Sequence, residues 1–213
     1  MIVGDVAAWA ESFKRYDERL LERICEILPK CIAALGGDPI EDQITINLVD
    51  RFHLDETIRK MFHHWEYQFE PFGHDENGAA FSKGKIDFVV CWDTERERYL
   101  AYEAKRLNVP NAKGGVSSLA TIYVTEGLVR FVKEQYSEGL PIGCMLGYVL
   151  DGNVTTVQSK VQTAISKNST LVGLAEGPSP IASIGTASRF SSVHVRDGSG
   201  TSIDIRHALV PCN

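Results

Sequence analysis

The sequence predicts one α/β domain in which helices flank a mixed central β-sheet. The chain has 213 residues, a length that suits a single domain with a substantial buried core. Its composition, 44% hydrophobic and 23% charged, is that of an ordinary folded protein. Segments with helical periodicity alternate with short apolar runs, and no internal repeat or linker interrupts them. We therefore expect residues 1–213 to form a single domain.

The N-terminal third is predicted to be mainly helical. Residues 6–35 carry apolar side chains at helical spacing, although Pro29 could kink or divide this segment. Residues 43–52 are ambiguous, because their apolar residues alternate like those of a strand while the flanking acids suit a helix. A short helix is expected over 55–62, and the alternating aromatic residues of 65–70 indicate a strand.

The middle of the chain is predicted to contain the centre of the sheet. Residues 86–92 and 99–107 are two apolar runs that we interpret as a hairpin. Polar, glycine-bearing segments at 73–84 and 108–118 flank this hairpin and are expected to be loops. Helical periodicity then predicts a helix over 119–137.

The C-terminal part is predicted to add a buried strand, a helix and a hairpin. Residues 141–150 are almost entirely apolar, which is typical of a strand buried on both faces. Residues 153–168 have the pattern of an amphipathic helix, and 173–185 is a loop rich in Gly, Pro and Ser. Residues 188–210 favour two strands around a turn at 197–200.

Three charged residues lie in the central hairpin, where apolar side chains are expected. Asp87 is on its first strand, and Glu103 and Lys105 are on its second. Side chains alternate between the two faces of a strand, so Glu103 and Lys105 share a face. Directly opposed residues of an antiparallel pair also share a face. The length of the turn therefore decides whether all three charges meet.

A turn of odd length brings the charges together. A three-residue turn at 94–96 sets Asp87 beside Glu103, with Lys105 on the same face. A two-residue turn at 95–96 would instead pair Asp87 with Ala104, which points to the other face. We expect the odd register, since it gathers the charges in one polar site instead of scattering them through the core.

Two adjacent carboxylates repel each other, and a divalent cation between them removes that repulsion. Mg²⁺ prefers one or two carboxylates, retained waters and phosphate oxygens as ligands. Asp87 and Glu103 would provide the carboxylates, and the backbone carbonyl of Ala104 a further oxygen. Lys105 could orient a metal-bound water or help to deprotonate it for attack on a phosphodiester. This arrangement favours hydrolysis of a phosphate ester.

Asp87 followed by Glu103-Ala104-Lys105 resembles the D…(D/E)-x-K motif of the PD-(D/E)XK nuclease superfamily, which includes restriction endonucleases. Ile86 stands where the motif's name places proline, a position that varies in the superfamily. The resemblance implies that Asp87 and Glu103 are metal ligands for Mg²⁺ or Mn²⁺ and that Lys105 orients the water. An acid elsewhere sometimes completes such sites, and the accessory candidates are Glu22, Glu26 and Glu70.

The predicted order of elements is similar to the α-β-β-β-α-β core of the same superfamily. The resemblance covers roughly residues 10–150. It implies a restriction-endonuclease-like domain, to which residues 151–213 add a C-terminal helix and hairpin as an extension.

The function that the resemblance implies is a metal-dependent nuclease that hydrolyses DNA, in a bacterial restriction or phage-defence setting. RNA is an alternative substrate, and the active form could be a homodimer or include a partner subunit. The net charge of −6 gives no global attraction for nucleic acid, so a local basic patch is needed. We expect that patch at Lys83, Lys85, Arg106 and Lys113. The alternative function is a catalytically inactive subunit of the same fold that binds DNA or a partner protein.

The five cysteines are odd in number and form no C-x-x-C pair, which predicts reduced thiols. No segment has the pattern of a signal peptide or the apolar length of a membrane span. We therefore expect a cytoplasmic protein without membrane contact.

Overall fold

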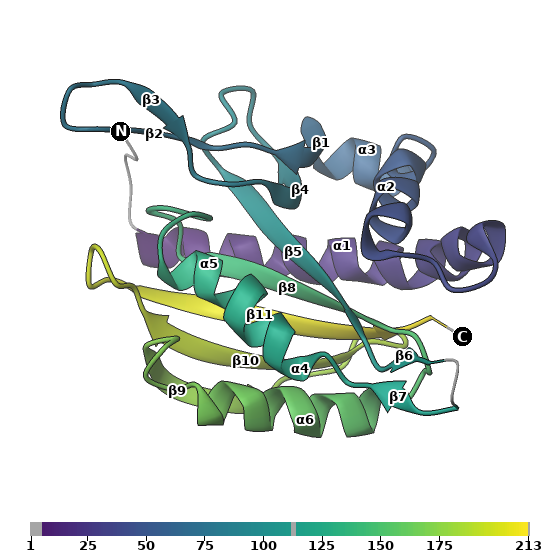
Figure 1. Ribbon diagram of the computed structural model, residues 1–213. Helices are drawn as coiled ribbons and strands as arrows, with labels where there is room; N and C mark the ends of the chain where they lie inside the picture. The colour runs from purple at the N-terminus through teal and green to yellow at the C-terminus, as the bar shows by residue number, and fades with distance from the viewer. Residues whose placement is uncertain (1–5, 112–113, 213) are drawn as a thin grey trace.

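The computed structural model describes residues 6–111 and 114–212, and it contains one large mixed sheet flanked by helices (Figure 1). Seven strands form this sheet. In spatial order they are β1 (His64–Phe69), β4 (Ile86–Cys91), β5 (Tyr99–Leu107), β8 (Ile142–Val149), β11 (Ser202–Pro211), β10 (Ser188–Val195) and β9 (Leu174–Pro180). The pairs β5–β8 and β8–β11 are parallel, and the other neighbours are antiparallel. The predicted mixed α/β architecture is confirmed.

Helices cover both faces of the sheet. On one face lie α1 (Val6–Leu35), α2 (Glu41–Phe52) and α3 (Glu56–Met61), which share a core with Phe88 and Val90 of β4. On the other face lie α4 (Ala120–Ile122), the π-helix η1 (Tyr123–Leu128), α5 (Val129–Val132) and α6 (Val154–Lys167), which share a core with Val89 and Cys91. From Phe88 to Cys91, successive side chains of β4 therefore pack into two separate hydrophobic cores. The central strand β8 is buried along its whole length, as predicted.

The ambiguous segment 43–52 is helical and belongs to α2. Ile44, Leu48 and Phe52 are all fully buried and follow one another at intervals of four residues, so a helix places them on one face toward the core. The acids Glu41 and Asp42 lie in the first turn, where they suit the helix dipole. The segment before it, α1, is one helix that continues through Pro29.

Three segments that we predicted as loops contain strands. The polar segment 73–84 overlaps the hairpin of β2 (Phe72–His74) and β3 (Ala80–Ser82), and 108–118 contains the short pair β6 (Val109–Pro110) and β7 (Val116–Ser117). The segment 173–185 contains β9, which pairs with β10 at the edge of the sheet. An edge strand needs hydrogen bonds on one side only and can be mostly exposed, so it tolerates the prolines and polar residues that suggested a loop.

The predicted helix over 119–137 is shorter and less regular than expected. It is divided into α4, η1 and α5, and ends at Val132. Gly127 lies within the π-helical part, which widens the turn.

The C-terminal strands form the predicted hairpin, β10–β11, but they do not lie outside the core sheet. β11 runs parallel to β8 along the whole length of β8, from the pair Asp204–Ile142 to the pair Pro211–Val149. Residues that follow the predicted core thus complete the centre of the sheet.

All five cysteines are unpaired and buried. Among the helices of residues 6–111 and 114–212, none is both long and apolar enough to cross a membrane.

Candidate active site

The register of the β4–β5 hairpin is the odd one that the sequence predicts. Phe88 pairs with Tyr102 and Cys91 with Tyr99, so one further step sets Asp87 opposite Glu103. The connection is longer than the predicted three-residue turn, because β4 already ends at Cys91 and β5 begins only at Tyr99. The connection is still centred on Glu95, so the number of residues between the two strands remains odd and the register is unchanged.

The loop is closed by Asp93. Its carboxylate accepts hydrogen bonds from the backbone N–H groups of Glu97 at 3.1 Å and Arg98 at 3.0 Å, and it also pairs with the Arg98 guanidinium. This buried acid holds the loop in the register that aligns Asp87 with Glu103.

The site forms where the C-terminal half of β5 extends past the N-terminal end of β4. In the described chain, the β4–β5 pairing stops at Phe88 and Tyr102, so the next N–H groups on that edge of β5 lack a strand partner. Asp87 Oδ2 accepts a hydrogen bond from the N–H of Ala104 at 2.7 Å, and Glu41 Oε2 accepts one from the N–H of Arg106 at 2.8 Å. Two carboxylates thus satisfy backbone donors that strand carbonyls would otherwise satisfy.

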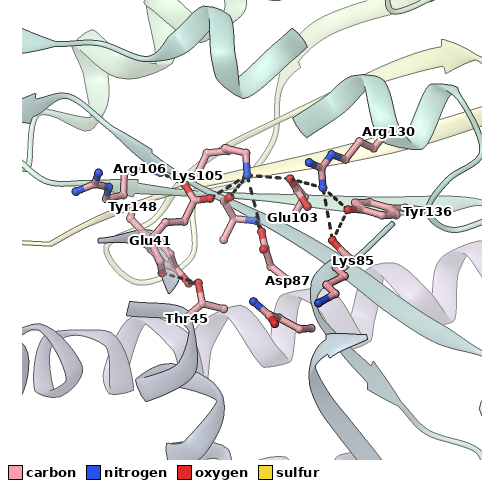
Figure 2. A network of polar contacts seen from close by, with 12 residues as sticks. Glu41, Thr45, Lys85, Asp87, Glu103, Lys105, Arg106, Arg130, Tyr136 and Tyr148 are labelled. Carbon is pink, nitrogen blue, oxygen red and sulfur yellow. Dashed lines mark hydrogen bonds and ion pairs between the residues drawn. The ribbon is translucent and has the colours of Figure 1, made fainter. Parts of the chain in front are cut away.

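Lys105 lies at the centre of this cluster (Figure 2). Its Nζ is 2.8 Å from Glu103 Oε1, 2.9 Å from Glu41 Oε1, 2.8 Å from the Ala104 carbonyl oxygen and 4.0 Å from Asp87 Oδ2. The structure therefore brings the predicted residues Asp87, Glu103 and Lys105 together. Three carboxylates thus surround a single ammonium group.

Glu103 is the most buried member of the cluster. Its side chain is 0% exposed, and neither carboxylate oxygen has a hydrogen-bond partner in the described chain, since its contacts with Lys105 and Arg130 are ion pairs without hydrogen-bond geometry. Burial, with the added repulsion of Asp87, raises the pKa of Glu103 to about 7. Burial also raises the pKa of Asp87, against the opposing effect of Lys105.

Lys105 remains protonated in this environment. Burial by itself lowers the pKa of Lys105, but the carboxylates of Glu103, Asp87 and Glu41 outweigh burial and raise it above the ordinary value. An ammonium with a raised pKa is suited to orient a water or stabilise negative charge, and is a poor proton acceptor. Of the two roles that the sequence left open for Lys105, the orienting role fits this geometry.

Arg130 borders the cluster on the side of the π-helix. Its Nη1 is 3.6 Å from Glu103 Oε1, and it donates to the hydroxyl of Tyr136, which itself donates to the carbonyl oxygen of Lys85. Gly127 allows the helix to approach Glu103, since a Cβ at this position would lie 3.4 Å from Glu103 Cγ and 2.7 Å from Met145 Cε.

The accessory acids predicted from the sequence lie elsewhere. Glu22 is exposed, Glu26 pairs with Arg23 at 2.8 Å, and neither Glu22 nor Glu70 makes a hydrogen bond or ion pair with residues that the structure describes. Glu41 lies in the cluster instead. In the sequence, Glu41 stands out only as an acid at the start of an amphipathic segment. The packing of α2 on the sheet is what brings its side chain to Lys105.

Two of the four predicted basic residues, Lys83 and Lys85, line a groove of about 490 Å³. Arg130 and Lys133, which the sequence analysis missed, line it too. Arg106 points away from this groove. It donates to the Pro39 carbonyl at 3.1 Å and borders a smaller cavity of about 290 Å³. The fourth residue, Lys113, lies outside the described residues.

A divalent metal in this cluster would need a suitable set of donor atoms. Within the described ranges, no group of three or more His, Cys, Asp or Glu side chains is arranged to hold a metal ion. The predicted ligand set is smaller, with the carboxylates of Asp87 and Glu103 and the Ala104 carbonyl, and Mg²⁺ accepts such a set because it retains waters. The two buried oxygens of Glu103, which lack hydrogen-bond partners in the described chain, fit a hard cation. Lys105 contacts both Glu103 and the Ala104 carbonyl, so its ammonium must move for a cation to bind both.

A second polar cluster, formed by Tyr123, Ser192, His194 and His207, is fully buried. Ser192 Oγ lies 2.7 Å from His194 Nε2 and 2.9 Å from His207 Nε2, which in turn connects through Nδ1 to Tyr123 at 3.0 Å. Burial lowers the pKa of His194 to about 4 and keeps both histidines neutral. The polar side-chain atoms of these four residues all have hydrogen-bond partners, including the Val172 carbonyl at 2.7 Å from His194 Nδ1, and none is open to a substrate, so this is an internal structural network.

The candidate active site is thus a cluster of Asp87, Glu103, Lys105 and Glu41 on the part of β5 that β4 leaves unpaired, beside a basic groove. Comparisons with protein-family models, with curated proteins and with solved structures find no match for this chain.

Proposed function

We propose that the protein is a metal-dependent nuclease that hydrolyses DNA phosphodiester bonds. The observation that carries this proposal is the convergence of Asp87, Glu103 and the Ala104 carbonyl around the Lys105 ammonium, at the point where β4 and β5 separate. Such a set of hard oxygen ligands beside a lysine ammonium suits phosphodiester hydrolysis.

The order of elements gives further support. With α2, α3 and the short pairs β2–β3 and β6–β7 regarded as insertions, the elements α1, β1, β4, β5, α4–η1–α5 and β8 follow the α-β-β-β-α-β order of restriction-endonuclease-like proteins. The resemblance of Asp87 and Glu103-Ala104-Lys105 to the PD-(D/E)XK motif agrees with that order. We propose this topology for the domain.

Each residue of the cluster has a proposed role. Asp87, Glu103 and the Ala104 carbonyl would hold the metal. Mg²⁺ or Mn²⁺ in such a site supplies Lewis acidity and lowers the pKa of a bound water. Lys105, which is protonated, orients the attacking water and stabilises the negative charge that develops on the phosphate oxygens. Glu41 holds Lys105 in place through its contact at 2.9 Å.

The surroundings of the cluster favour a polyanionic substrate in spite of the net charge of −6. Lys83, Lys85, Arg130 and Lys133 line the groove next to Glu103. Clustered lysine and arginine side chains bind phosphate groups of a nucleic-acid backbone. We propose DNA as the substrate, and a parallel assay with RNA tests the alternative.

Plasmid cleavage with Mg²⁺ or Mn²⁺, with and without EDTA, tests the proposal. The wild type is expected to cut only without EDTA. Asp87→Asn, Glu103→Gln and Lys105→Met are expected to lower the rate by about 100-fold or more, because each removes several kcal/mol of transition-state stabilisation. Glu22→Gln, at an exposed acid outside the cluster, is the matched control and should cut at the wild-type rate. Equal cleavage by all variants would place the active site elsewhere.

A second candidate function is a catalytically inactive subunit that uses the same fold to bind DNA or a partner protein. The observation that favours it is that the ammonium of Lys105 already forms ion pairs with the carboxylates of Glu41 and Glu103, so the cluster contains a positive charge without a metal ion. Calorimetric titration with Mn²⁺ separates the two functions. The nuclease should bind Mn²⁺ in a manner that Glu103→Gln abolishes, whereas a subunit whose cluster is a closed ion-pair network should bind none.

A further inference from the structure

The hairpin of β2 and β3 forms an ordered arm that extends beyond the ends of the central strands (Figure 1). Its tip is fixed by Asp75, whose carboxylate accepts hydrogen bonds from the N–H groups of Asn77 at 2.9 Å and Ala79 at 2.8 Å. Its base is closed by a hydrogen bond of 2.9 Å from the N–H of Lys83 to the carbonyl of Pro71. The arm therefore presents its side chains in defined positions.

Phe81 lies on one face of this arm and is 49% exposed. It pairs with Gly73, and a Cβ at Gly73 would lie only 2.6 Å from Phe81 Cζ and 2.9 Å from Lys83 Cε. The missing side chain thus lets the Phe81 ring and the stem of Lys83 lie side by side over the backbone. Phe72 is 65% exposed but pairs with Ser82, so it lies on the opposite face of the arm.

The basic groove begins where the arm ends. Lys83 and Gly84, which follow β3 directly, are part of its lining. Across the groove lie residues of η1 and α5 and of the segment after α5, namely Thr125, Glu126, Val129, Arg130, Lys133 and Gln135. The exposed aromatic ring of Phe81 and the cationic groove are therefore adjacent parts of one surface.

Two of the cations on this surface are available to a ligand. Lys83 pairs with Glu138, and Arg130 pairs with Glu103. By contrast, the ammonium groups of Lys85 and Lys133 are exposed and have no acidic partner in the part of the chain that the structure describes.

The groove itself is electropositive. Its lining contains one acid, Glu126, against the four basic residues Lys83, Lys85, Arg130 and Lys133. A negatively charged ligand is therefore favoured over a neutral or basic protein segment.

We propose that Phe81 and the adjacent groove bind an unpaired strand of the DNA substrate, with one base stacked on the Phe81 ring and phosphates on Lys85 and Lys133. This inference rests on the proposed function for the identity of the ligand. An exposed ring beside a cationic groove is the pattern that binds single strands, because an unpaired base has a free face while a base in a duplex is stacked on its neighbours. Arg130 connects the groove to Glu103, so a strand lying there leads into the cluster.

Fluorescence anisotropy with a labelled single-stranded oligonucleotide and the matching duplex, both in EDTA to prevent cleavage, tests the stacking contact. Phe81→Leu keeps Gly73 covered but removes the aromatic face, and should weaken single-strand binding by about tenfold. Phe81→Trp should retain the wild-type affinity. Phe72→Leu, the matched control on the opposite face, should change neither affinity, and duplex binding should change less than twofold in all variants. Unchanged single-strand binding by Phe81→Leu, or an equal loss with Phe72→Leu, would overturn the proposal.

Salt dependence of the same binding tests the phosphate contacts. Lys133→Ala should reduce the slope of log affinity against log salt concentration by about 0.7, the value for one phosphate contact on a single strand. Lys167→Ala changes another exposed lysine, at the end of α6, and should leave the slope unchanged. Equal slopes for wild type and Lys133→Ala would remove the groove from the binding surface.

These outcomes are separate from those of the cleavage assay. Single-strand binding that depends on Phe81, without metal-dependent cleavage, would refute the nuclease and leave the binding surface in place. Cleavage that depends on Asp87 and Glu103, together with unchanged binding by Phe81→Leu, would leave the nuclease and refute the surface. Absence of any single-strand binding by the wild type would also refute the surface.

Discussion

The carboxylate of Glu41 lies 2.9 Å from the ammonium of Lys105, although the two residues are 64 positions apart in the chain. The same carboxylate accepts the N–H of Arg106 through its other oxygen at 2.8 Å. The first residue of α2 therefore both completes the edge of β5 and restrains the lysine at the centre of the candidate active site.

Replacement of Glu41 should reduce activity while the protein stays folded. Glu41→Gln can still accept the Arg106 N–H, but it removes a charge that fixes Lys105, so we expect metal-dependent cleavage to fall by about tenfold or more. Asp42→Asn is the matched control, because it removes an acid from the same helical turn without a contact to Lys105. Circular dichroism verifies the fold of both. Equal cleavage by the two variants would show that the Glu41 contact has no role in catalysis.

Two replacements of Asp87 should separate its structural role from its proposed metal-binding role. Asp87→Asn keeps an oxygen that can accept the buried Ala104 N–H, whereas Asp87→Ala leaves that donor without a partner. We expect the free energy of unfolding, from urea denaturation, to be lower for Asp87→Ala than for Asp87→Asn by about 1–3 kcal/mol. Both should lose Mn²⁺ binding in calorimetry. If the two variants are equally stable, the hydrogen bond to Ala104 contributes nothing.

The raised pKa of Glu103 predicts how stability depends on pH without metal. Its pKa is about 7 in the folded protein and 4.5 ordinarily, so between these values the folded state holds a proton that the unfolded state has released. The contribution of Glu103 to the free energy of unfolding therefore falls as pH rises from about 4.5 to 7, by up to about 3 kcal/mol. Glu103→Gln cannot titrate, and urea denaturation at several pH values should show its stability relative to wild type increasing over this window. A constant difference would contradict the assignment.

Removal of the central cation should destabilise the fold strongly. Lys105→Met leaves the carboxylates of Glu103, Asp87 and Glu41 without their shared partner, and we expect the free energy of unfolding to drop by about 3–5 kcal/mol at neutral pH. The double variant Lys105→Met/Glu103→Gln should recover part of that loss, since it carries one fewer buried charge.

Lys60→Met provides a comparison for the loss at Lys105. Lys60 forms an exposed ion pair with Glu56, and its replacement should cost less than about 1 kcal/mol. A similar, small loss for Lys105→Met and Lys60→Met in thermal or urea denaturation would contradict the central role of Lys105.

Much of the fold followed from local patterns. The helical spacing in 6–35 and the apolar run of 141–150 predicted α1 and β8, because each pattern reflects burial that the element's own geometry imposes. The segments with weak patterns were assigned wrongly. β9 is mostly exposed at the edge of the sheet, and 73–84 forms the β2–β3 arm away from the core, so neither needed the apolar alternation that identifies a strand.

The candidate site was predicted in part for the same reason. Asp87, Glu103 and Lys105 belong to one hairpin, and their meeting depends only on strand alternation and the parity of the turn. Glu41 and Arg130 were missed because they reach the cluster from helices on the two opposite faces of the sheet. No pattern within a segment encodes which helix residue ends beside a distant strand.

The sequence by itself placed two acids and a lysine on one hairpin and predicted that they converge when the connection has an odd length, because side chains alternate between the faces of each strand. Only the tertiary structure decided what surrounds that convergence: the third acid, the bordering arginine, the central place of β11 and the basic groove beside the β2–β3 arm. Those features depend on how separate elements pack, and packing is set by the shape and volume of the whole core.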